Sequence, residues 1–145
     1  MTEIVLHAPI GLEALASAAR DALLTALERL GAAASSEVAL VLTDDEEIRR
    51  MNRDFRGIDE ATDVLSFAPR RQPSPAFDPA FLGDIVISVP FAERDARDAG
   101  HETVAEVRLL AVHGLLHLLG HDDSTPTGAD AMYRLEVELG FREAQ

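Results

Sequence analysis

The segment from residue 103 to residue 123 constrains the fold most, because it joins an apolar helical pattern to a polar turn. Residues 103–119 give the most apolar helical pattern of the chain, and Gly120 follows it. A helix that is apolar on most sides must be buried by other elements. Glycine readily adopts the left-handed conformation that ends a helix and reverses the chain. We therefore expect a central helix with a functional site at its C-terminal end.

Helical and strand patterns are mixed along the rest of the chain without strict alternation. This predicts the α+β class, with a mixed sheet of about four strands and helices packed on it. Residues 70–80 contain three prolines and no helical pattern, so the strands on either side should be antiparallel neighbours. Thr43 and Glu46 have the spacing of a capping box that begins a helix. Strands are predicted at 3–7, 37–42, 62–67 and 83–89, and helices at 12–30, 43–53, 91–99, 103–119 and 129–139.

Length and composition narrow the class of protein. A chain of 145 residues predicts a single domain spanning 1–145. The absence of cysteine excludes disulfides and thiolate metal sites, and the N-terminal residues lack the basic start of a secretory signal, so we expect a cytoplasmic protein. No apolar stretch is long enough to span a membrane, so no membrane partner is expected. The formal net charge of −13 argues against a broad, nonspecific nucleic-acid surface.

Two histidines on the central helix have the spacing of metal ligands. His113 and His117 are four residues apart, which places both imidazoles on one face of a helix. A third ligand can follow the Gly120 turn: Asp123 has the better spacing, whereas His121 is the better zinc ligand by type. Three protein ligands and an open fourth position are typical of a catalytic zinc site. Peptide hydrolysis is not favoured, because zinc peptidases need a glutamate where this chain has Gly114.

Four segments of the chain resemble motifs of one known family, the YbeY endoribonucleases. HGLLHLLGHDD at 113–123 is similar to the family's ligand motif HGxLHLxGYDH. TDVLSF at 62–67 and LGDIVIS at 82–88 resemble two further family segments, and MNRDFR at 51–56 resembles its LNxxYR stretch. The motifs occur in the family's order and spacing over most of the chain.

The resemblance implies a zincin-like fold and a zinc-dependent endoribonuclease that acts on single-stranded RNA. It implies a role in ribosomal RNA processing, in maturation of the 3′ end of 16S RNA and in ribosome quality control, with the small ribosomal subunit as partner. The family binds one zinc ion through three histidines. His113 and His117 match two of them, but the third position is Asp123 and the family's tyrosine position is His121.

The same resemblance implies that Arg56 and His117 are catalytic, with the Arg56 guanidinium placed to bind phosphate. Glu106 precedes the ligand motif on its helix and is expected on the solvated face, and His101, which has no motif context, is expected on the surface. Two other functions stay open: a metal-binding, ribosome-associated factor with little catalysis, and a metal hydrolase of another substrate. Further arginines could form a local basic rim for RNA, namely Arg49, Arg50, Arg53, Arg70 and Arg71.

Overall fold

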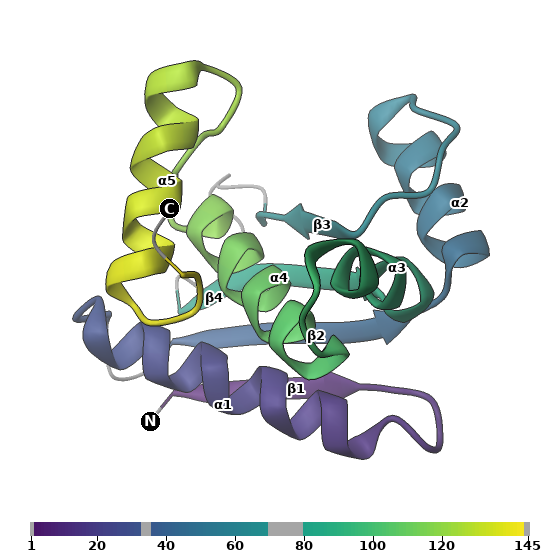
Figure 1. Ribbon diagram of the computed structural model, residues 1–145, viewed down its shortest axis with the longest axis horizontal. Helices are drawn as coiled ribbons and strands as arrows, with labels where there is room; N and C mark the ends of the chain where they lie inside the picture. Colours follow the sequence, from purple (N-terminus) through teal and green to yellow (C-terminus); the bar gives the residue numbers. More distant parts are fainter. Residues whose placement is uncertain (1, 33–35, 70–79, 144–145) are drawn as a thin grey trace.

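The computed structural model describes residues 2–32, 36–69 and 80–143, and it confirms an α+β fold with a mixed four-stranded sheet (Figure 1). The proline-rich segment is described only at Ala80, so the prediction for 70–79 lies outside the described residues, as do Arg70 and Arg71. In chain order the elements are β1 (Glu3–His7), α1 (Glu13–Arg29), β2 (Glu37–Thr43), α2 (Asp45–Arg56), β3 (Val64–Phe67), β4 (Phe81–Ser88), α3 (Val89–Ala99), α4 (Thr103–Leu118) and α5 (Pro126–Glu138).

The sheet has the strand order β1-β2-β4-β3. β1 pairs parallel with β2, and β2 pairs parallel with β4. β3 pairs antiparallel with β4, with Ser66 opposite Ile85, so the predicted antiparallel neighbours are confirmed. β3 is therefore one edge of the sheet.

The side chains of β4 alternate between two hydrophobic cores, one on each face of the sheet. Successive side chains of a strand point to opposite faces of a sheet. Ile85 and Ile87 join the larger core with buried residues of α1 and α4. Val86, between them, packs with Ile48 of α2 and Leu65 of β3 in a smaller core. The apolar pattern of 103–118 is explained by this arrangement, because α4 lies across the sheet and also contacts α1, α3 and α5 (Figure 1).

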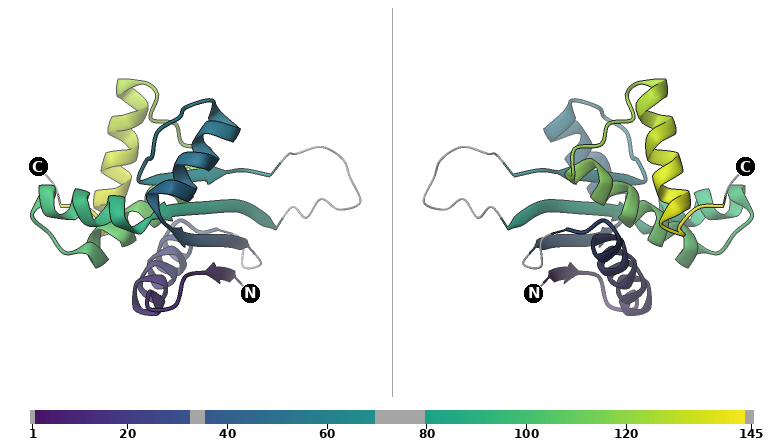
Figure 2. Two further views of the ribbon diagram at one scale, coloured as in Figure 1. Left: turned by 90° about the vertical axis from the view of Figure 1, so that its right-hand side faces the viewer. Right: turned by 90° about the vertical axis from the view of Figure 1, so that its left-hand side faces the viewer.

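Two helices, α2 and α5, lie on the β3 side of the sheet but apart from each other (Figure 1). In both views of Figure 2, α2 and α5 rise on the β3 side of the sheet, whereas α1 lies on the β1 side. The C-terminal end of α4 lies beside α5 and close to β3 (Figure 1). Within the described ranges, no helix has both the length and the apolar character needed to cross a membrane.

Several predicted boundaries are wrong, each for a local reason. The N-cap of α2 is Asp44, which accepts a hydrogen bond from the Glu47 backbone at 2.9 Å, whereas Thr43 is the last residue of β2. Pairing with β2 starts β4 at Phe81, two residues before the predicted strand. α5 begins at Pro126, since proline is favoured in the first turn of a helix.

Candidate metal centre

His113, His117 and Asp123 come together at the C-terminal end of α4. The two histidines lie one turn apart on the helix, and Asp123 lies in the loop before α5. All three side chains are partly exposed, at 23%, 30% and 43%. Within the described residues, these three are the group of histidine and carboxylate side chains that could hold a metal ion.

The donor atoms of this group have the spacing of a metal site. The Nε2 atoms of His113 and His117 are 3.2 Å apart. Asp123 Oδ2 lies 3.3 Å from His113 Nε2 and 3.5 Å from His117 Nε2. Donors bonded to zinc at about 2.0–2.1 Å in tetrahedral geometry would be about 3.3–3.4 Å apart. The triangle of donor atoms therefore fits one zinc-sized ion, with room for a fourth ligand.

Hydrogen bonds orient both imidazoles so that Nε2 of each is available to a metal ion. His117 Nδ1 lies 3.0 Å from the carbonyl oxygen of His121. A carbonyl only accepts, so Nδ1 carries the proton and Nε2 keeps its lone pair. His113 Nδ1 lies 3.3 Å from Glu136 Oε1, which favours the same tautomer. The hydrogen bond to Glu136 raises the pKa of His113 above its ordinary value, against the effect of burial.

The turn after α4 brings Asp123 to the histidines. Gly120 has φ of 99°, as expected for a residue that ends a helix by reversing the chain. Asp122 accepts hydrogen bonds from the backbone and hydroxyl of Ser124, both at 2.8 Å, and so fixes the next turn. A Cβ atom at Gly128 would lie 2.0 Å from the Asp122 carbonyl oxygen, so this loop packs directly on the first turn of α5.

The two alternatives for the third ligand occupy different places. The Asp123 carboxylate faces both imidazoles, whereas His121 provides its backbone carbonyl to His117. The His121 side chain is exposed and does not join the group of potential ligands.

The packing around Gly114 leaves no space for the glutamate that zinc peptidases have at this position. A Cβ atom at this position would lie 2.8 Å from Ile85 Cγ2 and 3.0 Å from Ser66 Oγ. The Ser66 hydroxyl donates to the Gly114 carbonyl at 3.0 Å, which fixes α4 against β3. A glutamate side chain has no room here without displacing the sheet.

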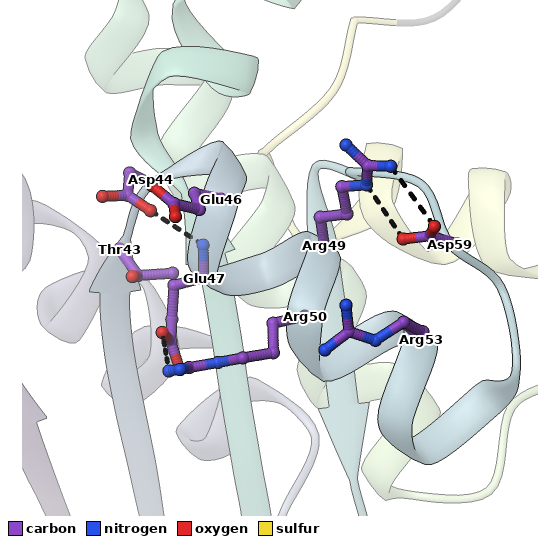
Figure 3. A pocket seen from close by; sticks show the side chains of 8 residues that line it. All are labelled: Thr43, Asp44, Glu46, Glu47, Arg49, Arg50, Arg53 and Asp59. Atoms are coloured by element: carbon purple, nitrogen blue, oxygen red, sulfur yellow. Dashed lines mark hydrogen bonds and ion pairs between the residues drawn. The ribbon is translucent and has the colours of Figure 1, made fainter.

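The arginines of α2 are mostly paired with carboxylates. A hollow of about 800 Å³ along this helix is lined by eight residues and contains none of the three potential ligands (Figure 3). Within it, Arg49 pairs with Asp59 at 2.9 Å and Arg50 pairs with Glu47 (Figure 3). Arg53 pairs with Asp54 at 3.1 Å. Of the predicted basic rim, the three arginines that the structure describes are therefore each paired with a carboxylate.

Arg56 lies at the C-terminal end of α2, is exposed and, among the described residues, forms no ion pair. Its neighbour Phe55 is 72% exposed, and the Phe55 ring meets the Phe67 ring edge-on with centroids 5.4 Å apart. Phe67 follows Ser66 on β3, so the end of α2 is linked to the helix that carries His113. Phe55 is not among the residues predicted for the site, although the aromatic residue beside Arg56 in MNRDFR was an available signal.

Two buried carboxylates were not predicted from the sequence. Glu106 is 7% exposed, so the prediction that it is solvated is wrong, whereas His101 lies on the surface as predicted. Glu106 Oε2 lies 2.5 Å from His101 Nε2. Glu136 is 2% exposed and contacts His113 from α5. Glu136 was missed because it lies 23 residues from its partner in the chain, a separation without a local pattern.

Comparisons with known proteins agree with these motifs. A family model described as "Endoribonuclease YbeY" matches residues 6–142. A protein of Moorella thermoacetica named endoribonuclease YbeY is 47% identical over 130 residues, covering 86% of this chain and 83% of that protein. One of Gloeobacter violaceus with the same name is 50% identical over 116 residues, covering 78% of this chain and 60% of that protein. A solution structure of a Thermotoga maritima protein is 25% identical, with a TM-score of 0.64 over 96% of this chain and 86% of that one.

Proposed function

The chain belongs to the YbeY endoribonuclease family, and from this premise we propose that it is a metal-dependent endoribonuclease that cleaves single-stranded RNA. The observation that carries the proposal is the triangle of donor atoms at 3.2–3.5 Å formed by His113, His117 and Asp123. We propose that these three residues hold one zinc ion. When bound, zinc supplies Lewis acidity, polarising a phosphoryl oxygen and lowering the pKa of a bound water to about 7.

The chain's own residues have separate tasks in this proposal. His117, held by the His121 carbonyl, presents Nε2 to the ion, and Asp123 adds a negatively charged ligand where the family has a histidine. Arg56 binds the phosphate next to the cleaved bond, because a planar guanidinium matches phosphate oxygens with two hydrogen bonds. The resemblance of MNRDFR to the family's LNxxYR stretch and the exposed position of Arg56, without an ion pair among the described residues, support this assignment.

The finer part of the proposal concerns the substrate. We propose that the RNA is ribosomal RNA, cleaved on the small subunit during maturation of the 16S 3′ end and during quality control. The site of action would then be the cytoplasm, where ribosomes are assembled, and the chain would act as one domain. The net charge of −13 is consistent with a substrate bound at one local site and repelled elsewhere.

The test is cleavage of one RNA in single-stranded and duplex form by the purified chain. We expect cleavage of the single strand, loss of cleavage with a chelator, and restoration by zinc. A second substrate, small subunits carrying a 3′-extended 16S RNA, tests the ribosomal role. Metal binding without cleavage of either substrate would favour a ribosome-associated binding factor. Chelator-sensitive cleavage of peptides alone would favour a hydrolase of another substrate.

Phe55 provides a prediction about the preference for single strands. Unpaired bases stack on exposed aromatic rings, each stack contributing about 1–3 kcal/mol, whereas the bases of a duplex are already stacked. We therefore expect Phe55→Ala to weaken binding of a short single-stranded RNA about tenfold. Binding is measured by fluorescence anisotropy with chelator present, so that no cleavage occurs.

Matched variants identify the cause of that effect. Phe55→Trp should bind as well as the original chain, since it keeps an aromatic face. Ile10→Ala is the control, because Ile10 is 99% exposed and lies before α1, away from this edge. Equal affinity of Phe55→Ala and the original chain would remove Phe55 from the RNA site.

A further inference from the structure

Glu136 is a carboxylate that the fold buries beside the metal centre. Its side chain is 2% exposed, and burial of a charged group costs several kcal/mol unless the group is paired. Both oxygens have partners: Oε1 lies 3.3 Å from His113 Nδ1, and Oε2 lies 3.4 Å from Arg142 Nη2. The carboxylate thus connects an arginine near the C-terminus to a potential metal ligand on α4.

The two histidines are oriented by partners of different chemistry. His117 donates to a neutral backbone carbonyl, which belongs to the turn after its own helix. His113 donates to a carboxylate that comes from a different helix, α5. A carboxylate makes the imidazole a stronger electron donor than a neutral acceptor does, and partners of this kind typically change metal affinity 10–100-fold.

We propose that Glu136 is a positioning residue that holds His113 with Nε2 directed at the metal and raises the affinity of the centre. This inference rests on the proposed function, and it assigns to the α5 carboxylate a role that the ligand motif at 113–123 does not contain. Glu136 does not touch the ion or the RNA; it acts through His113.

Arg142 stabilises the buried Glu136 carboxylate. Its guanidinium pairs with Glu136 and lies over the Tyr133 ring, 5.2 Å from the ring centroid. Arg142 Nε is buried and, within the described residues, has no hydrogen-bond partner. An arginine held in this way offsets the cost of burying the Glu136 charge, so the carboxylate stays directed at His113.

The test measures zinc affinity of the metal-free chain by competition with a chromophoric chelator, without RNA. Glu136→Gln keeps the shape and an acceptor oxygen but removes the charge, and we expect affinity to fall about tenfold. Glu136→Leu also removes the acceptor, and we expect a fall of about 100-fold. The thermal midpoint of each metal-free variant separates loss of affinity from loss of folding.

Glu106→Gln is the matched control, since Glu106 is also a buried carboxylate hydrogen-bonded to a histidine, His101, outside the metal centre. Its zinc affinity should equal that of the original chain. If Glu136→Leu does not fold, Glu136→Gln still decides the question. Unchanged affinity in Glu136→Gln, or a fall no larger than in Glu106→Gln, would overturn the inference. If the original chain binds no metal at all, the proposed function itself fails.

Discussion

His117→Ala is expected to abolish chelator-sensitive RNA cleavage, with a fall on the order of 10³-fold or more. The variant removes one of three donor atoms, and the remaining pair of His113 and Asp123 gives an ion only two protein ligands. The His117 side chain is 30% exposed and its polar contacts are with His113, Asp123 and the His121 carbonyl, so the fold should persist. The measurement is the single-turnover rate of cleavage of a single-stranded RNA, with zinc content determined on the same sample.

His121→Ala and Asp123→Ala are the matched variants for that experiment. The His121 side chain is exposed, and its contribution to the centre is a backbone carbonyl that alanine retains. We therefore expect His121→Ala to cleave like the original chain and Asp123→Ala to lose zinc. The reverse pattern would make His121 the third ligand. Cleavage that persists equally in His117→Ala would come from a contaminating nuclease.

Gly83→Ala is expected to cause the largest loss of stability, about 3 kcal/mol or more. Gly83 has φ of 138°, a conformation that other residues rarely adopt. A Cβ atom would also lie 2.4 Å from the Phe67 carbonyl oxygen and 2.7 Å from Leu118 Cδ2. Since Phe67 is paired with β4, this carbonyl cannot move without disturbing the β3 edge. The measurement is urea unfolding of the metal-free chain.

Gly31→Ala separates the two causes of that loss. Gly31 has φ of 67°, but a Cβ atom there would meet nothing within 4 Å. This variant should therefore lose only the conformational part, about 1–2 kcal/mol. If both variants lose the same free energy of unfolding, the close contact with Phe67 and Leu118 is not what requires glycine in the LGDIVIS segment.

The fold was predictable where its causes are local. The apolar period of 103–119 predicted a buried helix, and the absence of a helix between two strands predicted that β3 and β4 are antiparallel. The start of α2 was wrong because Thr43 and Asp44 are both good capping residues, and only the end of β2 decides between them. Glu106 was placed on the surface although its partner His101 is only five residues away, because the face of α4 that is covered is decided by tertiary contacts such as those with α3.

The sequence by itself determined which residues could hold a metal, because histidines four apart on a helix and a glycine turn before Asp123 are short-range geometry. It also identified the family, since four motifs occur in order. Only the tertiary structure decided that Asp123 faces both imidazoles, that Glu136 and Arg142 reach His113 from the C-terminal part of the chain, and that Phe55 lies against Phe67. Contacts such as those of Glu136 with His113 and of Phe55 with Phe67 follow from the packing of whole helices against other elements, which no local pattern encodes.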